Sequence, residues 1–324
     1  MIESISKMLL SYEAGLLPKI IKKYYYWACN TAKKKIGELS IENAVVKLDF
    51  RSLNIVADSN FCNLYINLRD EGLSADLYRW GIREPLNTYT LFNFIKEEKI
   101  DSVLDIGSNI GYFPLVELAA GAKEVVCIEP VPETFLFLKR NINRFKNSRA
   151  FNFAIGDETG KIRMYIPNKL NLATCRPEAL QFIQSEVAII EVDCLSLEDS
   201  IQFCGLKNKS VLIRMDVEGF EENILKSIPK EVYGISLELH EHILGYEKSC
   251  ALINRLYNRG YKIEICVREL MGYIPVIKLL GIKRALQFYE RITKETRIIY
   301  EPSMELIKQL LKMQCNPYLY FTKK

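Results

Sequence analysis

The chain has 324 residues, of which 49% are hydrophobic and 26% are charged, and its formal net charge is +4. This is enough apolar material for one large core, or for a domain with extensions, and the composition excludes a disordered protein. So small a net charge gives no reason to expect a nucleic-acid partner.

Nine cysteines are spread along the chain without a C-x-x-C pair. Structural zinc sites need close ligand pairs, so no such site is expected. Cys127 and Cys194 lie in apolar runs typical of strands, which favours reduced, buried thiols. The chain also lacks an apolar run of about eighteen residues, and Met1 to Leu10 does not resemble a signal peptide. A soluble, cytoplasmic protein without a transmembrane segment is predicted.

Residues 1 to about 40 are predicted to be helical, with Pro18 as a break, because apolar residues recur at helical spacing. The segment 19–35 combines lysines with tyrosines and a tryptophan. This composition favours a packing helix with a solvated basic edge. Contact with a membrane surface or with a nucleic acid is the alternative interpretation.

Two alternating patterns follow, at residues 45–50 and 63–68. Alternation of apolar and polar side chains is typical of half-buried strands, so a small antiparallel element is predicted. The segment 69–85 is dense in charge and is expected to be irregular. Residues 1–86 are therefore predicted to form an N-terminal extension of helix and strand.

From about residue 87, short apolar runs alternate with helical patterns. Strands are predicted at residues 102–106, 124–129, 150–154, 161–166, 187–192, 211–216, 234–239, 261–267 and 318–322. Helices are predicted at residues 88–98, 111–120, 131–145, 197–204, 220–227, 247–258, 274–292 and 303–313. The alternation predicts an α/β fold over residues 87–324, with a doubly wound, mostly parallel sheet and helices on both faces. A helical insertion at about 268–316 is expected before the last strand.

The first strand of this region runs into a glycine-bearing turn that opens a helix, Asp105-Ile-Gly-Ser-Asn-Ile-Gly111. Gly107 and Gly111 let backbone and ligand approach closely at the carboxyl end of a strand, where α/β sheets bind ligands. The second strand ends in Glu129, whose carboxylate can accept hydrogen bonds from both hydroxyls of a ribose. A nucleotide-containing cofactor is therefore predicted here.

A dinucleotide-binding turn has glycine where this chain has Asn109, which argues against an NAD-dependent oxidoreductase. Asp105 places a negative charge beside the turn, which repels phosphates but suits the ammonium group of a methionine moiety. The cofactor favoured is therefore S-adenosylmethionine (SAM). The predicted cofactor-binding residues are Asp105, Gly107, Asn109, Gly111, Glu129 and Asp157. Asp157 follows the third strand and could accept a hydrogen bond from adenine, although Gly-Asp is also a common turn sequence.

The fourth strand ends in Asp216-Val-Glu-Gly-Phe-Glu221. Close carboxylates raise one another's pKa, which is useful to a general base, and together they could hold a divalent ion. The alternative is that some of these acids only favour the N-terminus of the next helix.

The fifth strand ends in Glu238-Leu-His-Glu-His242, which contains both histidines of the chain. In an extended strand, Glu238, His240 and His242 would point to one face. Asp216, Glu238 and His240 are the predicted catalytic residues, with His240 as a base or a substrate ligand. No metal site is predicted.

Taken in order, these motifs resemble the FkbM-type SAM-dependent methyltransferases. The resemblance runs through Val103–Phe113, Ile128–Pro130, Ala154–Asp157, Met215–Glu221 and Leu237–His240, and covers roughly residues 60–265. It implies a class I methyltransferase fold, SAM as cofactor and, most often, O-methylation of a sugar, a glycan or another small molecule. By the same resemblance Asp105, Gly107 and Glu129 would bind SAM. Asp157 would hold the adenine, and Asp216 and His240 would face the acceptor.

Two alternatives remain open from the sequence. The chain could be a non-catalytic SAM-binding or scaffold protein, although the intact acids Asp216, Glu218 and Glu238 speak against a decayed site. It could also be an RNA 2′-O-methyltransferase, which would need a basic groove. Methylation of a nucleobase is disfavoured because the turn after the fourth strand lacks an Asn/Asp-Pro-Pro-Tyr-like sequence.

Overall fold

The computed structural model describes residues 16–38, 43–57, 61, 63–70, 72–168, 170–180, 186–269, 271–293, 295–313 and 316–323. The strands are β1 (Asn43–Lys47), β2 (Asn63–Asn67), β3 (Ser102–Ile106), β4 (Glu124–Ile128), β5 (Ser148–Phe151), β6 (Ala154–Gly156), β7 (Gly160–Pro167), β8 (Val187–Ser196), β9 (Val211–Met215), β10 (Val232–Glu238), β11 (Tyr261–Val267), β12 (Ile298–Tyr300) and β13 (Tyr318–Lys323). The α-helices are α2 (Leu16–Glu38), α3 (Leu73–Trp80), α4 (Pro85–Glu97), α5 (Tyr112–Ala120), α6 (Pro132–Ile142), α7 (Leu197–Phe203), α8 (Glu221–Ile224), α9 (Glu241–Leu244), α10 (Tyr246–Asn258), α11 (Ile274–Leu280), α12 (Ile282–Thr293) and α13 (Met304–Lys312).

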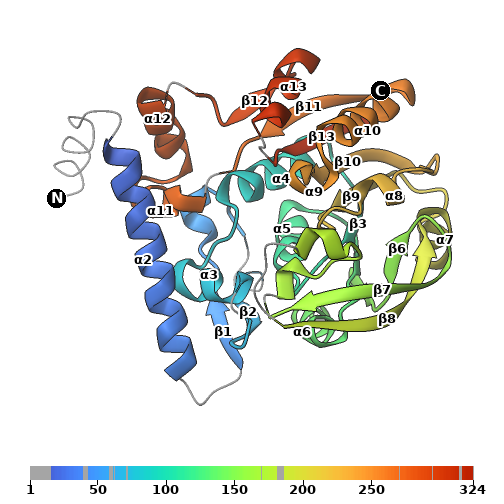
Figure 1. The fold of residues 1–324 in the computed structure, drawn as a ribbon, viewed down its shortest axis with the longest axis horizontal. Coiled ribbons are helices and arrows are strands. Elements are labelled where there is room, and N and C mark those ends of the chain that lie inside the picture. The colour runs from blue at the N-terminus through green and yellow to red at the C-terminus, as the bar shows by residue number, and fades with distance from the viewer. Residues whose placement is uncertain are drawn as a thin grey trace.

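An eight-stranded sheet of order β12-β11-β13-β10-β9-β3-β4-β5 forms the centre of the molecule (Figure 1). The strands from β10 to β5 in this order are parallel to their neighbours, whereas β13 runs antiparallel between β10 and β11. The expected α/β fold of the class I methyltransferase type, doubly wound and mostly parallel, is confirmed by this order. The order also reverses between β3 and β9, which is where open α/β sheets bind ligands.

Helices cover both faces of this sheet, and alternate residues of each strand serve the two faces. Val103 and Cys127 belong to the hydrophobic cluster that includes residues of α4, α5 and α6. Leu104 and Val126 belong to the opposite cluster, with residues of α7, α10 and α13. Every residue of β3 is buried, as expected of a parallel strand covered on both sides.

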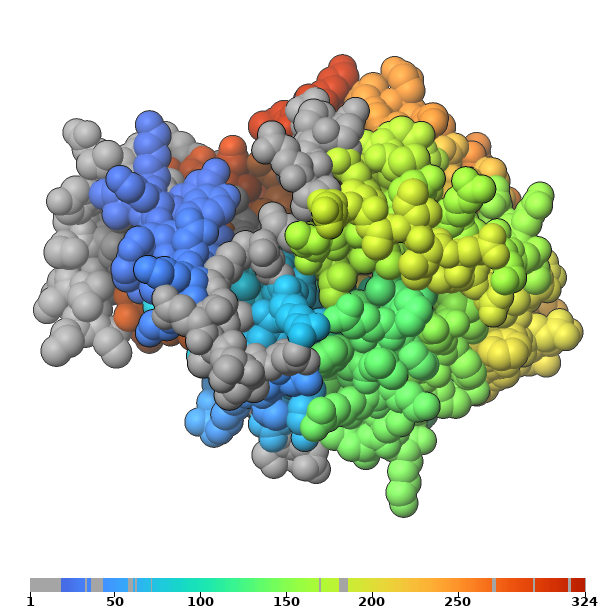
Figure 2. All heavy atoms as spheres, turned by 60° about the horizontal axis from the view of Figure 1, so that its bottom comes forward, coloured from blue at the N-terminus to red at the C-terminus, as the bar shows by residue number. Residues whose placement is uncertain are grey.

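Helix α2 begins at Leu16, so Pro18 lies in its first turn and does not break it. The first backbone N–H groups of a helix have no partner within the helix, so proline is tolerated there. As predicted, α2 is a packing helix with a basic edge, because Ile21, Tyr25 and Ala28 are buried. The exposed side chains on its other side include Lys19, Lys22, Lys23, Lys34 and Lys35. In Figure 2, α2 (blue) lies on the left of the molecule and α7 (yellow) on the right. The predicted helix before Leu16 lies outside the described residues.

The prediction that residues 69–85 are irregular is wrong, because α3 lies within them. Leu77 and Trp80 are buried in this helix, and the Trp80 ring stacks on Tyr25 of α2 with 6.0 Å between the ring centroids. The charges that suggested an irregular segment are used in tertiary structure, since Arg83 forms an ion pair with the buried Asp76.

The C-terminal segment differs from prediction in two details. The helix expected at residues 274–292 is two helices, α11 and α12, separated by Gly281 with φ +76°. The three-residue strand β12, which pairs with β11 at the sheet edge, was not predicted. One hydrophobic cluster includes residues of α2, α4 and α12. The predicted boundary between an N-terminal extension (1–86) and an α/β domain (87–324) remains a prediction. Within the described ranges, the helices are too short or too polar to cross a lipid bilayer.

Replacement of Trp80 by alanine tests the packing of α2 on α3. Truncation of a buried tryptophan leaves a cavity, so Trp80→Ala should lower the free energy of unfolding by about 3–5 kcal/mol and make α2 more sensitive to limited proteolysis. Tyr78→Ala, in the same helix but at a side chain that is 40% exposed, should change it by about 0.5 kcal/mol or less. Equal effects of the two variants in denaturant titrations would contradict this packing.

Candidate active site

A cavity of about 760 Å³ lies at the carboxyl ends of the parallel strands. It is lined by the turn after β3, the end of β4, the end of β6, the loop after β9 and the end of β10. Lys19, Lys22 and Tyr26 of α2 also line it. Its size is typical of sites for small ligands, and its place matches the ligand sites of α/β sheets.

Glu129 lies at the end of β4 and is held in place by the turn after β3. One carboxylate oxygen accepts the backbone N–H of Asn109 at 2.9 Å, and the other accepts that of Val131 at 2.8 Å. Burial raises the pKa of Glu129 to about 7, although these two hydrogen bonds lower it. Each oxygen keeps a lone pair, so the ionised carboxylate can still accept hydrogen bonds from a ligand.

Two glycines of the predicted cofactor turn have different tasks. Gly107 has φ +81° and lines the cavity, and a Cβ there would lie 2.1 Å from the backbone oxygen of Asp216. Gly111 has φ +94° but does not line the cavity, and a Cβ there would lie 3.1 Å from the side chain of Leu138. Gly111 therefore allows α5 to pack on α6. Its position outside the cavity lining does not favour the predicted contact with the cofactor.

Asp105 does not reach the cavity either, contrary to the prediction that it faces an ammonium group. Its side chain is fully buried, and its Oδ1 lies 3.3 Å from Nη1 of Arg214. Nη2 of Arg214 lies 3.1 Å from Oδ2 of Asp216, which lines the cavity. Asp105 therefore acts on the site through Arg214, because β3 turns the Asp105 side chain toward the protein interior.

Asp157 also lies outside the cavity lining. Its carboxylate is exposed and pairs with Lys226 at 2.8 Å, and this hydrogen bond lowers its pKa. An acceptor for adenine should face the cavity, so the placement of Asp157 does not favour the predicted contact. The neighbouring Ala154 and Ile155 do line the cavity.

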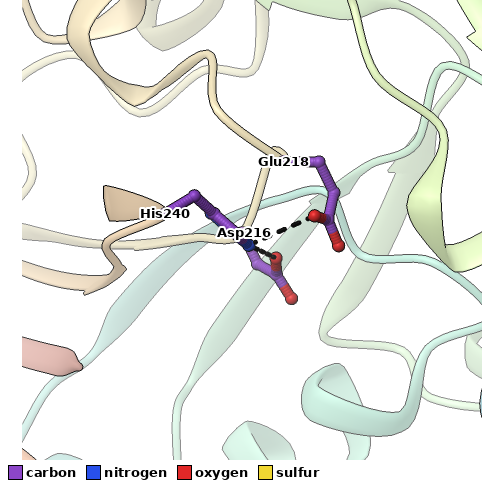
Figure 3. A group of neighbouring side chains, drawn as sticks. All are labelled: Asp216, Glu218 and His240. Atoms are coloured by element: carbon purple, nitrogen blue, oxygen red, sulfur yellow. Dashed lines mark ion pairs between the residues drawn. The ribbon is translucent and has the colours of Figure 1, made fainter. Parts of the chain in front are cut away.

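The predicted catalytic residues come together in the lining of the cavity. Nε2 of His240 lies 3.8 Å from Oδ1 of Asp216 and 3.8 Å from Oε1 of Glu238. It lies 3.3 Å from Oε2 of Glu218. Figure 3 marks the pairs of His240 with Asp216 and Glu218 by dashed lines. Nδ1 of His240 lies 2.5 Å from Oε1 of Glu221. Four carboxylates therefore surround one imidazole.

The electrostatics of this cluster follow from its burial. Burial raises the pKa of Glu218 to about 7, although His240 lowers it. Burial and then Asp216 raise the pKa of Glu238 well above its usual value. Burial lowers the pKa of His240, but the nearby carboxylates, Glu218 and Glu221 first, outweigh this effect and raise it well above its usual value. The cluster thus favours a positive charge at its centre.

We expected His242 to share a strand face with Glu238 and His240, but the structure does not show this. Strand β10 ends at Glu238, and His240 is the N-cap of α9. His242 lies in that helix, is exposed, and its Nδ1 is within hydrogen-bond distance of the Asn316 side chain. The prediction failed because the chain leaves the extended conformation before residue 242.

Several residues of the site were not predicted. Arg214 and the buried Glu221 orient other side chains, and their partners are close only in the folded chain. Glu84 and Glu218, with φ of +40° and +46°, also line the cavity, as does the predicted Asn109, with φ of +49°. Non-glycine residues in this conformation cost about 1–3 kcal/mol each and cluster at functional sites.

No curated protein sequence matches the chain. One similar solved structure is a putative RNA methyltransferase from Pyrococcus horikoshii, with 12% identity, TM-score 0.37, and 76% of this chain and 88% of that chain covered. Another is a SAM-dependent methyltransferase from Agrobacterium tumefaciens, with 10% identity, TM-score 0.38, and coverage of 81% and 67%. A third is an O-methyltransferase from Bacillus cereus in complex with SAH, with 15% identity, TM-score 0.31, and coverage of 77% and 86%.

These TM-scores are too low to carry an argument, so the fold assignment rests on the strand order described above. Independently of these structures, residues 105–263 match the methyltransferase FkbM domain. This match contains the glycine turn, Glu129 and the acidic cluster. The expectation of an FkbM-type methyltransferase with SAM as its cofactor is confirmed at the level of the family. Residues 105–263 of this chain are a methyltransferase FkbM domain.

Proposed function

We propose that this chain methylates a hydroxyl group of a sugar, a glycan or another small molecule. The observation that carries the proposal is that the acidic cluster and Glu129 line the same cavity. One end of the cavity therefore suits a nucleoside, and the other suits a group that must lose a proton. SAM supplies the methyl group from its sulfonium.

The residues of the cavity fit this cofactor. Glu129 can accept hydrogen bonds from the ribose hydroxyls. Ala154, Ile155 and Phe220 offer an apolar surface beside it for the adenine ring. The carboxylates of the cluster lie where a positive charge is stabilised, which suits a sulfonium. We assign the adenine contact to this apolar surface in place of Asp157.

At the other end, Asp216, Glu238 and His240 would bind the acceptor hydroxyl and take its proton. A hydroxyl has a high pKa, so its attack on a methyl group is assisted by a group that removes the proton as the bond forms. The protein would otherwise contribute alignment of the acceptor oxygen with the methyl group. An amine acceptor fits less well, because carboxylates stabilise its protonated form, which has no lone pair.

The features of the cavity weigh against the alternatives. An RNA substrate needs many cations along its path, but the cavity that Lys19 and Lys22 line is also lined by several carboxylates. A non-catalytic binding protein has no need for an imidazole buried among four acids. Among the described residues, Cys29, Cys127, Cys175, Cys194, Cys204 and Cys250 are free thiols, which supports the cytoplasmic location that we infer.

The raised pKa of Glu129 predicts that SAM binding depends on pH. Because only the ionised carboxylate accepts hydrogen bonds from both ribose hydroxyls, affinity should rise as pH increases through about 7. The gain between acidic and alkaline buffers should approach about tenfold, measured by calorimetric titration from well below to well above that pKa. Glu129→Gln cannot ionise, so it should bind more weakly and lose this part of the pH dependence. The same pH dependence in both proteins would remove Glu129 from the ribose site.

Substitutions in the cluster should separate catalysis from cofactor binding. An acceptor is first found by screening glycans and hydroxylated metabolites for the production of S-adenosylhomocysteine (SAH). With that acceptor, kcat should fall by about 10²–10⁴ in each of Asp216→Asn, Glu238→Gln and His240→Ala. The Kd of SAM should rise by a much smaller factor, because the cluster carboxylates contact only the sulfonium end of the cofactor in this proposal. Glu191→Gln, at an exposed position of β8, is the matched control and should keep full activity. Unchanged kcat in all three cluster variants would contradict the proposed role.

A further inference from the structure

Three side chains of the cluster offer ligand atoms to one point. One oxygen of Asp216, one oxygen of Glu218 and one ring nitrogen of His240 all lie within 4.8 Å of one another. Figure 3 shows the carboxylates and the imidazole converging from the loop after β9 and the segment after β10. This spacing suits three ligands around a single ion.

The orientation of His240 provides a separate argument. The residue is only 2% exposed, and its Nδ1 faces Oε1 of Glu221 at 2.5 Å. The same Glu221 oxygen accepts the backbone N–H of Gly219 at 3.1 Å, which fixes the carboxylate. A histidine that binds a metal usually donates its second ring N–H to a carboxylate in this way, which leaves Nε2 free to coordinate. His240 therefore has the supporting contact of a metal ligand, and its Nε2 faces Asp216 and Glu218.

The charge of the cluster also calls for a cation. Glu221 is fully buried, and its Oε2 has no hydrogen-bond partner among the described residues. Arg214, which pairs with Asp216, is shared with Asp105. Buried carboxylates without enough counter-charge are costly. A divalent ion at the shared point would offset several of these charges at once.

We propose that Asp216, Glu218 and His240 bind one divalent transition-metal ion of the Mn²⁺ type at the acceptor end of the cavity. Two carboxylate oxygens with one imidazole nitrogen favour such an ion over Ca²⁺ and Mg²⁺, which prefer ligand sets made only of oxygen. From the sequence, the acids after the fourth strand could hold a divalent ion, but no metal site was predicted. The structure adds His240, which follows a different strand, to Asp216 and Glu218.

Binding of the ion does not depend on the proposed function, but its use in catalysis rests on it. With three protein ligands, positions on the ion remain open for an acceptor hydroxyl. The ion would hold that oxygen and lower its pKa, which would assist the loss of its proton. The site thus adds a means of positioning to the proposed O-methylation.

The test uses the full chain after treatment with EDTA, without SAM or acceptor. The protein is titrated with Mn²⁺, and electron paramagnetic resonance measures how much of the ion remains free. We expect one ion per chain. Asp216→Asn and Glu218→Gln, which preserve side-chain shape, should each weaken binding by at least about tenfold. Glu191→Gln is the control and should bind as the wild type does. Absence of bound Mn²⁺, or equal binding by wild type, Asp216→Asn and Glu218→Gln, would overturn the proposal.

Methyl transfer assayed in parallel separates this proposal from the function it builds on. We expect EDTA treatment to lower kcat by at least about tenfold and Mn²⁺ to restore it. Full activity of EDTA-treated protein that binds no Mn²⁺ would overturn the metal site and leave the O-methylation proposal intact. Tight Mn²⁺ binding without methyl transfer to any hydroxyl acceptor would support the site and contradict the proposed function.

Discussion

The guanidinium of Arg214 holds the two halves of the site at a fixed distance. Its Nη1 lies 3.3 Å from Oδ1 of Asp105 and 3.3 Å from the backbone oxygen of Gly107, and its Nη2 lies 3.1 Å from Oδ2 of Asp216. It also lies over the ring of Phe113, 4.1 Å from the centroid. A buried charge is tolerated only when its partners are in place. The glycine turn after β3 and the acidic loop after β9 are therefore coupled, and Asp105 serves the site without reaching the cavity.

The apolar runs of the central strands were sufficient to predict most of the sheet. A parallel strand covered on both faces must be continuously apolar, so β3, β4, β9 and β10 lie close to their predicted positions. Helix α3 was missed because the charges at Asp76 and Arg83 suggest a solvated loop until their ion pair is known. Strand β12 has three residues, too few for a periodic pattern, and depends on pairing with β11.

The site could be predicted in position but not in detail. The carboxyl ends of parallel strands meet at one edge of a sheet, which is why Glu129, Asp216 and His240 were brought to one cavity. The direction of a side chain at a strand end is not contained in its spacing along the sequence. Asp105 consequently points inward and Asp157 outward. The contact of Glu221 with His240 joins positions 19 residues apart and arises only from the crossover between β9 and β10.

A crystal structure of the chain with S-adenosylhomocysteine (SAH) tests the central claim most directly, because the claim concerns where the cofactor lies. We predict the ribose hydroxyls on the carboxylate of Glu129, the adenine against Ala154 and Ile155, and the sulfur directed toward Asp216 and His240. A ligand bound elsewhere, or one whose sulfur faces away from the acidic cluster, would contradict this account of the site.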